Sequence, residues 1–404
     1  MGRRPPPGDG WGRCGADSRT VRILMRLHNV RVLTANGLAA AGTTSIEADD
    51  AEDRDASGLI LSPGWMDLHA HLRDPGFPEK ETLATGAASA AFGGFTNVVA
   101  MANTNPVIDR ADRLRELQAR AALLPIRVSL VGAVTVGLDG LTLTDAVAMK
   151  AAGAVALSDD GRHGMDRATL RRALAGAATA GLPVFIHAQD ERRGNGPDAE
   201  AAAVEDALEA VATVSGARLH IQHVSTRAAV DLIRTAKRQR LPVSAEVTPH
   251  HLALTSREAA ALGPHGNVNP PLRSEDDRLA LLQALSDGVV DAIATDHAPH
   301  EPAAKAAGAN GFHGFETALA VVSGLGLRDE VVYRACVRRP REIIGQSLEE
   351  EWILVDPDIE WTVDASSFKS RGRNTPFHGR RVRGRVVMTV CRGQILVERM
   401  VQRV

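Results

Sequence analysis

Eight short apolar runs, alternating with alanine-rich amphipathic stretches, dominate the middle of this chain. The alternation is typical of βα units, in which a helix follows each parallel strand and returns the chain to the same edge of the sheet. The runs cover residues 59–69, 96–101, 127–131, 154–157, 183–187, 218–223, 242–247 and 289–295, and helical stretches between them include 83–92, 110–122, 167–180, 198–215 and 227–237. Eight units predict an α/β fold, a (β/α)8 TIM barrel. The competing topology, an open doubly wound sheet, would place a glycine-rich phosphate turn after its first strand, and none is present.

The two ends of the chain do not follow this alternation. Residues 21–32 and 382–401 contain β-branched runs that predict short strands. We expect residues 21–58 and 346–404 to form one small β-sandwich domain beside a barrel that spans residues 59–345. Residues 1–20 are rich in glycine, proline and arginine and are expected to be a disordered extension, which makes Met25 an alternative start to Met1.

Composition excludes several classes of function. Lysine and arginine number 47 against 49 aspartates and glutamates, so neither a nucleic-acid nor a membrane surface is indicated. No apolar run approaches the roughly 20 residues that a membrane-spanning helix needs. The three cysteines, Cys14, Cys336 and Cys391, are scattered and fit a reducing cytosol better than a disulfide framework. These features predict a cytoplasmic protein.

Histidine and aspartate lie at the ends of five predicted strands. They are His69 and His71 after the first, Asp159 and Asp160 after the fourth, His187 after the fifth, His223 after the sixth and Asp296 after the eighth. The carboxyl ends of barrel strands meet at one mouth, where catalytic groups come from several strands. His69 and His71 are two positions apart, so both rings project from the same side of an extended strand. Nitrogen and oxygen donors in this number suit two zinc ions that share a carboxylate.

Six segments resemble the motifs of one protein family, and they occur in that family's order. They are DLHAHLRDPG at 67–76, MANTNP at 101–106, SDDG at 158–161, HVST at 223–226, NPPLR at 269–273 and TDHAPH at 295–300. Together they are similar to the type I dihydroorotases of the amidohydrolase superfamily. The resemblance covers residues 59–325 strongly, and residues 366–397 also resemble the family's C-terminal β segment.

The resemblance implies a role for each strand-end residue. One zinc would be held by His69, His71 and Asp296, and a second by His187 and His223. Asp160 would be shared by both ions, at the place where hydantoinases have a carboxylated lysine. The choice of Asp160 over its neighbour Asp159 follows the family's register. Asp296 would also carry a proton between the attacking hydroxide and the leaving nitrogen.

The resemblance also implies four substrate contacts. Arg73 offers a planar fork for bidentate binding of a substrate carboxylate, and its alternative role is a structural ion pair. Asn103 and His300 resemble the family's other carboxylate contacts. Asn269 resembles its contact to the ring amide. For both asparagines, capping of a loop or a turn is an alternative role.

The function implied is that of a dihydroorotase of de novo pyrimidine (UMP) synthesis. Such an enzyme reversibly cyclises N-carbamoyl-L-aspartate to L-dihydroorotate, and hydroxide attacks the cyclic amide in the hydrolytic direction. Two alternatives remain open: a hydantoinase- or allantoinase-like cyclic amidohydrolase, and a non-catalytic scaffold subunit of aspartate transcarbamoylase. A homodimer is expected, with aspartate transcarbamoylase as a candidate partner. The loops at 191–200 and 301–313 are shorter than the family norm, which makes closure over the substrate an open question.

Overall fold

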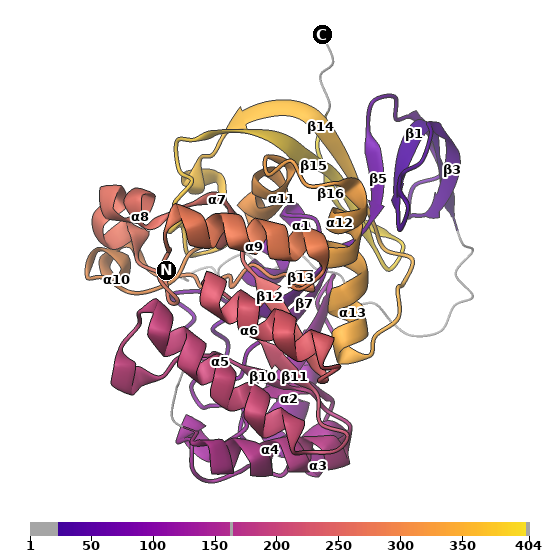
Figure 1. The fold of residues 1–404 in the computed structure, drawn as a ribbon. Coiled ribbons are helices and arrows are strands. Elements are labelled where there is room, and N and C mark those ends of the chain that lie inside the picture. Colours follow the sequence, from indigo (N-terminus) through magenta and orange to yellow (C-terminus); the bar gives the residue numbers. More distant parts are fainter. Residues whose placement is uncertain (1–22, 162–164, 401–404) are drawn as a thin grey trace, which may run out of the picture.

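The computed structural model describes residues 23–161 and 165–400, and it contains a parallel barrel beside a mixed sheet (Figure 1). The barrel strands pair in sequence order: β6 (Trp65–Ala70), β7 (Phe95–Ala100), β8 (Arg127–Gly132), β9 (Ala154–Ser158), β10 (Val184–Ile186), β11 (Leu219–Ile221), β12 (Val243–Val247) and β13 (Ala292–Ile293). A parallel bridge between Ala70 and His297 joins the two ends of this order, so the barrel is nearly closed. The predicted (β/α)8 fold is confirmed.

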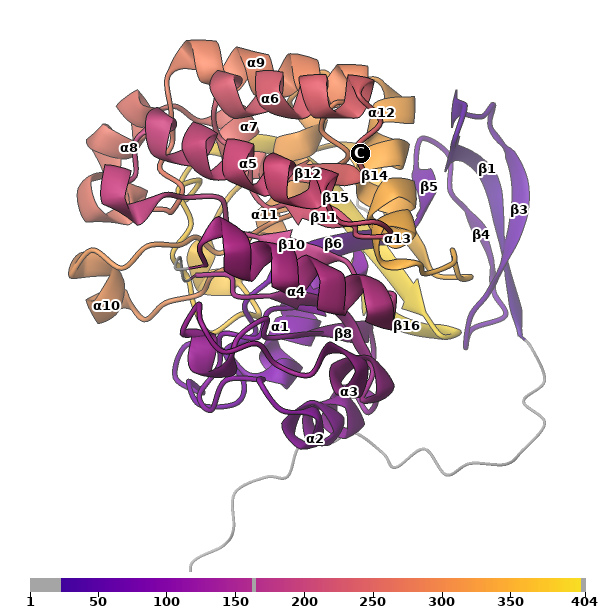
Figure 2. The ribbon, with the colours of Figure 1, turned by 60° about the horizontal axis from the view of Figure 1, so that its bottom comes forward.

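Helices cover the outside of the barrel (Figure 2). The longer ones are α1 (Leu83–Phe92), α2 (Ala111–Ala121), α4 (Arg167–Ala180), α5 (Pro197–Ala212), α6 (Arg227–Arg238), α9 (Glu275–Asp287) and α11 (Phe315–Ser323), and the shorter ones are α3 (Ala146–Ala151), α7 (Pro249–Ala253), α8 (Ser256–Leu262), α10 (Pro302–Ala306), α12 (Asp329–Tyr333) and α13 (Arg339–Ile344). Helix α4 shows why the boundaries are readable from sequence. Asp166 caps its first turn by accepting from the Thr169 amide, and Gly181 ends it in the left-handed conformation. In the described residues, no helix is long and apolar enough to cross a membrane.

The barrel interior is packed with apolar side chains below the mouth. Its members include Met66, Leu68, Val99, Met101, Val131, Ala156, Phe185, Ala292 and Ala294. This filling leaves no pore, as expected for a barrel of eight strands.

The N- and C-terminal segments meet in a mixed sheet beside the barrel. Its strands are β1 (Leu24–Thr34), β2 (Gly37–Leu38), β3 (Gly42–Glu47), β4 (Asp53–Asp55), β5 (Ile60–Pro63), β14 (Trp352–Thr362), β15 (Arg381–Cys391) and β16 (Gln394–Glu398). In Figure 1 the indigo strands of the N-terminus stand next to the yellow strands of the C-terminus. β5 joins the two groups, because it pairs with β1 on one side and β14 on the other. The extension predicted at residues 1–20 lies outside the described residues.

The strand predicted at 59–69 is two strands in the structure, which corrects that prediction. β5 belongs to the mixed sheet, and β6 begins the barrel at Trp65. Between them, a Cβ on Gly64 would lie 2.1 Å from Thr96 Oγ1 of β7. Glycine allows this close approach, and both neighbouring strands are largely buried, so the apolar run gives no sign of the break.

The sequence analysis also missed β14. Its first half is apolar, but Pro357 and the acidic residues around it interrupt the pattern. The pairing of β14 with β15 shifts register between Asp356 and Glu360, so an irregularity breaks the alternation that would identify a strand.

Candidate metal centre

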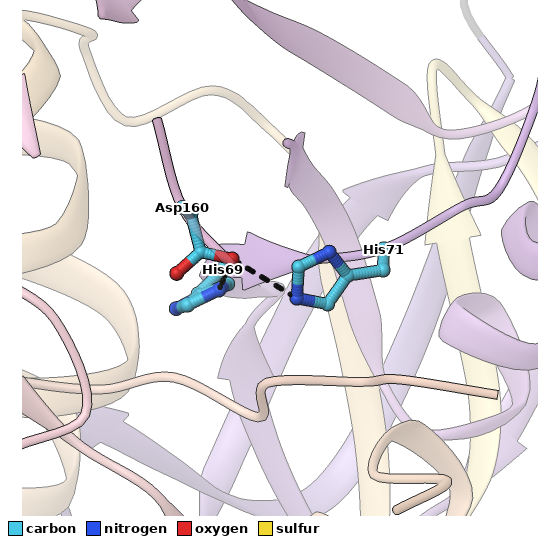
Figure 3. A group of neighbouring side chains, drawn as sticks. All are labelled: His69, His71 and Asp160. Atoms are coloured by element: carbon cyan, nitrogen blue, oxygen red, sulfur yellow. Dashed lines mark ion pairs between the residues drawn. The ribbon is translucent and has the colours of Figure 1, made fainter. Parts of the chain in front are cut away.

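The six predicted ligands come together at the carboxyl ends of the barrel strands. Figure 3 shows one half of the cluster, where His69 and His71 from the end of β6 face the Asp160 carboxylate that follows β9. Asp160 Oδ2 lies 3.3 Å from Nε2 of both histidines. All three side chains are buried, and their ligand atoms are close enough to share one ion.

The other oxygen of Asp160 faces the second pair of histidines. Asp160 Oδ1 lies 3.6 Å from His187 Nδ1 and 3.5 Å from His223 Nε2. These atoms form a second group that could hold an ion. One carboxylate therefore lies between two histidine pairs, with one oxygen directed at each.

Asp296 joins the cluster on the side of His69 and His71. Its Oδ1 atom lies 3.1 Å from His71 Nε2 and 3.5 Å from His69 Nε2. Asp296 has a φ of 48° and His223 a φ of 31°, in the left-handed region that residues other than glycine rarely adopt. Backbone strain of this kind concentrates at functional sites, where it directs a side chain toward the centre.

The chemistry of the cluster fits metal binding. Asp160 Oδ1 is buried but has no hydrogen-bond partner among the described residues, which is costly unless a cation satisfies it. Burial disfavours the charge on Asp160, but His69, His187 and His223 outweigh it and hold the pKa of the carboxyl well below its usual range. An ionised carboxylate among imidazole nitrogens is a donor set that suits zinc and similar divalent ions.

The structure distinguishes the two adjacent aspartates of the SDDG segment. Asp159 accepts hydrogen bonds from the amides of Val134 and Thr135, at 2.7 and 3.0 Å, so its carboxylate anchors the loop after β8. Asp160 faces the histidines instead. The geometry therefore places Asp160, and not Asp159, among the candidate ligands.

Glu246 on β12 is a residue that the sequence analysis missed. Its fully buried carboxylate lies between two rings, with Oε1 2.8 Å from His69 Nδ1 and Oε2 3.1 Å from His220 Nε2. Burial would raise the pKa of Glu246, but its hydrogen bonds with His220 and His69 lower that pKa to about 2. Contacts of this kind fix the orientation of a metal-binding imidazole. The sequence feature that could have identified Glu246 is its position as a charged residue inside the apolar run at 242–247.

Arg73 lies at the mouth, two residues after His71, with a φ of 58°. Its Nε atom is buried without a hydrogen-bond partner among the described residues. Burial lowers the pKa of Arg73 to about 10, against the opposing effect of Asp296, Asp160 and Glu81. The guanidinium therefore stays protonated at neutral pH, with donor capacity left for an anion.

The other predicted substrate contacts lie near the same mouth but already have partners. Asn103 Oδ1 accepts from His71 Nδ1 at 2.9 Å, and Asn269 Nδ2 donates to Gln189 Oε1 at 3.0 Å. His300 Nε2 lies 2.7 Å from the Asn310 carbonyl, while its Nδ1 is buried without a partner in the described chain.

Lys305, on the short helix α10 that follows His300, was also missed. The side chain is buried, and Nζ donates to the carbonyls of Asn267, Ala309 and Gly311, the last two at 3.0 and 2.9 Å. Burial lowers its pKa to about 8. One ammonium group thus joins the chain before Asn269 to the loop that carries His300.

Comparison with known proteins places the chain in one family. A family model described as Dihydro-orotase-like matches residues 58–207. The dihydroorotase of Anaeromyxobacter dehalogenans (strain 2CP-C) is 44% identical to this chain over 384 residues, which cover 86% of this chain and 89% of that protein. The dihydroorotase of Thermus aquaticus is 38% identical, covering 93% and 99% of the two chains.

Solved structures give the same fold at lower sequence identity. The L-hydantoinase (dihydropyrimidinase) from Arthrobacter aurescens superposes with a TM-score of 0.84 at 24% identity, covering 95% of this chain and 98% of that one. At that identity the likeness supports the architecture, a barrel with an adjoining sheet, and leaves the choice of substrate to the residues at the mouth.

Proposed function

Because this chain belongs to the dihydroorotase family and is a metal-dependent cyclic amidohydrolase, we propose a specific assignment of its active site. The reaction is the reversible conversion of N-carbamoyl-L-aspartate into L-dihydroorotate in pyrimidine synthesis. The centre would hold two zinc ions: His69, His71 and Asp296 would hold one, His187 and His223 the other, and Asp160 would contribute to both. The observation that supports this assignment best is the Asp160 carboxylate, which directs one oxygen at each histidine pair.

Bound zinc would lower the pKa of a coordinated water toward neutrality and polarise the amide carbonyl. The protein must orient the rings that hold these ions. Glu246 does so for His69, and Asn103 does so for His71, each through the Nδ1 atom that faces away from Asp160. Both histidines then present Nε2 to the centre.

Asp296 is the proposed proton carrier. Burial opposes its ionisation, but His69, His71 and His223 hold its pKa below the ordinary value, so the carboxylate is available as a base. In the hydrolytic direction Asp296 accepts a proton from the attacking water. It then donates this proton to the ring nitrogen as the amide bond breaks, which leaves the carboxylate ionised for the next cycle.

Arg73 is the proposed anchor for the substrate carboxylate. The substrate in either direction carries a carboxylate beside the reacting group, and a guanidinium binds such a group through two parallel hydrogen bonds. The buried, unpartnered Nε of Arg73 provides one of these donors. Asn103 and His300 would add contacts to the carboxylate and Asn269 a contact to the ring amide.

Comparative turnover tests this function against its relatives on the same fold. Purified, zinc-replete protein should hydrolyse dihydroorotate and leave hydantoin and allantoin nearly untouched. Activity on hydantoin or allantoin alone would overturn the proposed substrate. A scaffold subunit without activity is disfavoured because all six candidate ligands are present and grouped.

We also propose that the enzyme acts in the cytoplasm as a homodimer, with aspartate transcarbamoylase as a candidate partner. The short loops at 191–200 and 301–313 give this proposal its reason, since a second protein can complete a mouth that a short loop leaves open. Sedimentation would report the oligomer. If adding the transcarbamoylase leaves the dihydroorotase activity unchanged, the proposed partnership is contradicted.

A further inference from the structure

A small cavity of about 120 Å³ lies between the barrel and the mixed sheet. The barrel contributes α1 and α11 to its wall, and the sheet contributes β14 and β15 with the chain beside them. Its charged and aromatic lining consists of Phe92, Glu316, Trp361, Phe368, Lys369, Arg385 and Arg399. None of these side chains belongs to the metal centre or to the proposed substrate contacts.

Three cations face this cavity, and each lies over an aromatic ring. Lys369 Nζ is 4.6 Å from the centre of the Phe92 ring, and Arg399 Cζ is 4.9 Å from the centre of the same ring. Arg385 Cζ is 4.7 Å from the Trp361 ring. The aromatic contacts fix the position of the cations but supply no negative charge to balance them.

Glu316 is the single carboxylate in the lining, and it is already engaged. It accepts from Ser89 Oγ at 2.9 Å and from the Lys369 amide at 2.7 Å, and it lies 3.5 Å from His313 Nε2. Burial acts against its charge, but its contacts with His313 and its other donors lower its pKa, so the group is ionised. One negative charge faces three positive ones.

The positive charge of the cavity is only partly compensated. Neither Arg385 nor Arg399 has a carboxylate within ion-pair distance in the described residues. Arg399 donates to the Val386 carbonyl, and no side-chain hydrogen bond of Arg385 is present among the described residues. Burial, together with repulsion from Arg385, lowers the pKa of Arg399 to about 10. Half-buried like charges of this kind are unfavourable unless an anion joins them.

We propose that this cavity binds one phosphate-type oxyanion, either free or as the end of a phosphate monoester. Two guanidinium groups and an ammonium are the donors that recognise such an anion best. The volume is below the roughly 300 Å³ of an ordinary small-molecule pocket, so the oxyanion fits and any organic remainder of a monoester would extend outward. This site is separate from the dihydroorotase reaction and does not depend on the roles assigned above.

Titration of the zinc-loaded full-length protein with inorganic phosphate, at constant ionic strength, tests the proposal. We expect saturable binding of one phosphate per chain by calorimetry, with a change in tryptophan fluorescence that Trp361→Phe abolishes. The double variant Arg385→Gln/Arg399→Gln should weaken binding about tenfold or more, because each charge-assisted contact is lost. Arg385→Lys/Arg399→Lys should retain part of the affinity.

Two controls separate this cavity from other cationic sites. Arg383→Gln removes a charge from an exposed position on the same strand, where Arg383 pairs with Asp358, and should leave the affinity within about twofold. A nucleoside monophosphate titrated in parallel distinguishes a monoester from free phosphate as the preferred form. The proposal is overturned by absent or non-saturable binding, by equal binding in the double variant, or by binding that only Arg73→Met removes.

Discussion

The two sides of the catalytic mouth are built differently. The metal side consists of residues at strand ends, where neighbouring parallel strands fix the spacing, and the Nδ1 atoms of His69 and His71 have a carboxylate and an amide partner. The substrate side consists of loop residues: Arg73 and His300 each have a buried nitrogen without a partner among the described residues. Rigid placement suits ions, which need fixed distances. Unused donors suit a substrate that must enter and leave.

From this comparison we expect the largest loss of turnover for Asp296→Asn, a change on the metal side of the mouth. An amide keeps the shape of the side chain but cannot carry the proton, so turnover should fall about 10²–10⁴-fold while the thermal unfolding temperature stays near that of the wild type. Steady-state rates with dihydroorotate, together with a melting curve, measure both. A variant with near-normal turnover would remove Asp296 from the proton path.

Arg73→Met should give the next largest effect, on the substrate side. Loss of a bidentate contact to a carboxylate lowers kcat/KM about a hundredfold, with most of the change in KM. Zinc content should not change, because Arg73 is not a ligand. Arg73→Lys should recover only part of the loss, since an ammonium cannot make the paired contact. If the variant lost bound zinc to the same extent as its affinity for dihydroorotate, Arg73 would instead contribute to the metal centre.

Glu246→Gln should act on the metal side without touching the substrate. The amide weakens the hold on the Nδ1 atom of His69, and the affinity for zinc should fall about tenfold or more. Competition with a chelator measures this change, and excess zinc should restore turnover. If zinc affinity were unaffected, Glu246 would be a structural partner of His220 alone.

Lys305→Met should have the smallest effect and should be confined to the substrate side. Three carbonyls lose their donor, so the loop after His300 loosens and KM for dihydroorotate should rise about fivefold with kcat nearly constant. Lys150→Met, on the exposed face of α3, is the matched control and should leave both constants unchanged. A fall in kcat alone would show that Lys305 acts on the metal side after all.

The same contrast explains what the sequence could predict. His69, His71, His187, His223 and Asp296 lie at the ends of apolar runs or directly after them, and a barrel brings all strand ends to one mouth, so their grouping follows from the fold. The choice of Asp160 over Asp159 followed the family's register instead. Glu246 escaped notice because its partners are rings on two other strands, and Lys305 because one of its three carbonyl partners, that of Asn267, belongs to a loop distant in sequence. Such contacts depend on tertiary packing, which no local pattern encodes.

The two errors in predicting the strands have a similar cause. The apolar run at 59–69 continues smoothly through Gly64, yet the chain passes from one sheet to another at that residue because Thr96 leaves no room for a side chain. β14 contains Pro357 and a register shift, so its alternation is broken. Strands could be predicted wherever the pattern of apolar residues was regular. The prediction failed where pairing with a strand distant in sequence decided the structure.

The most direct test of the account is the metal content of Asp160→Ala beside that of the wild type. The carboxylate between the two histidine pairs is the feature on which the two-ion centre depends. Elemental analysis should find two zinc ions per wild-type chain, and no more than one in Asp160→Ala, with dihydroorotase activity nearly lost and the fold retained by circular dichroism. Two ions in a folded Asp160→Ala protein, or one in the wild type at full activity, would contradict the shared-carboxylate centre.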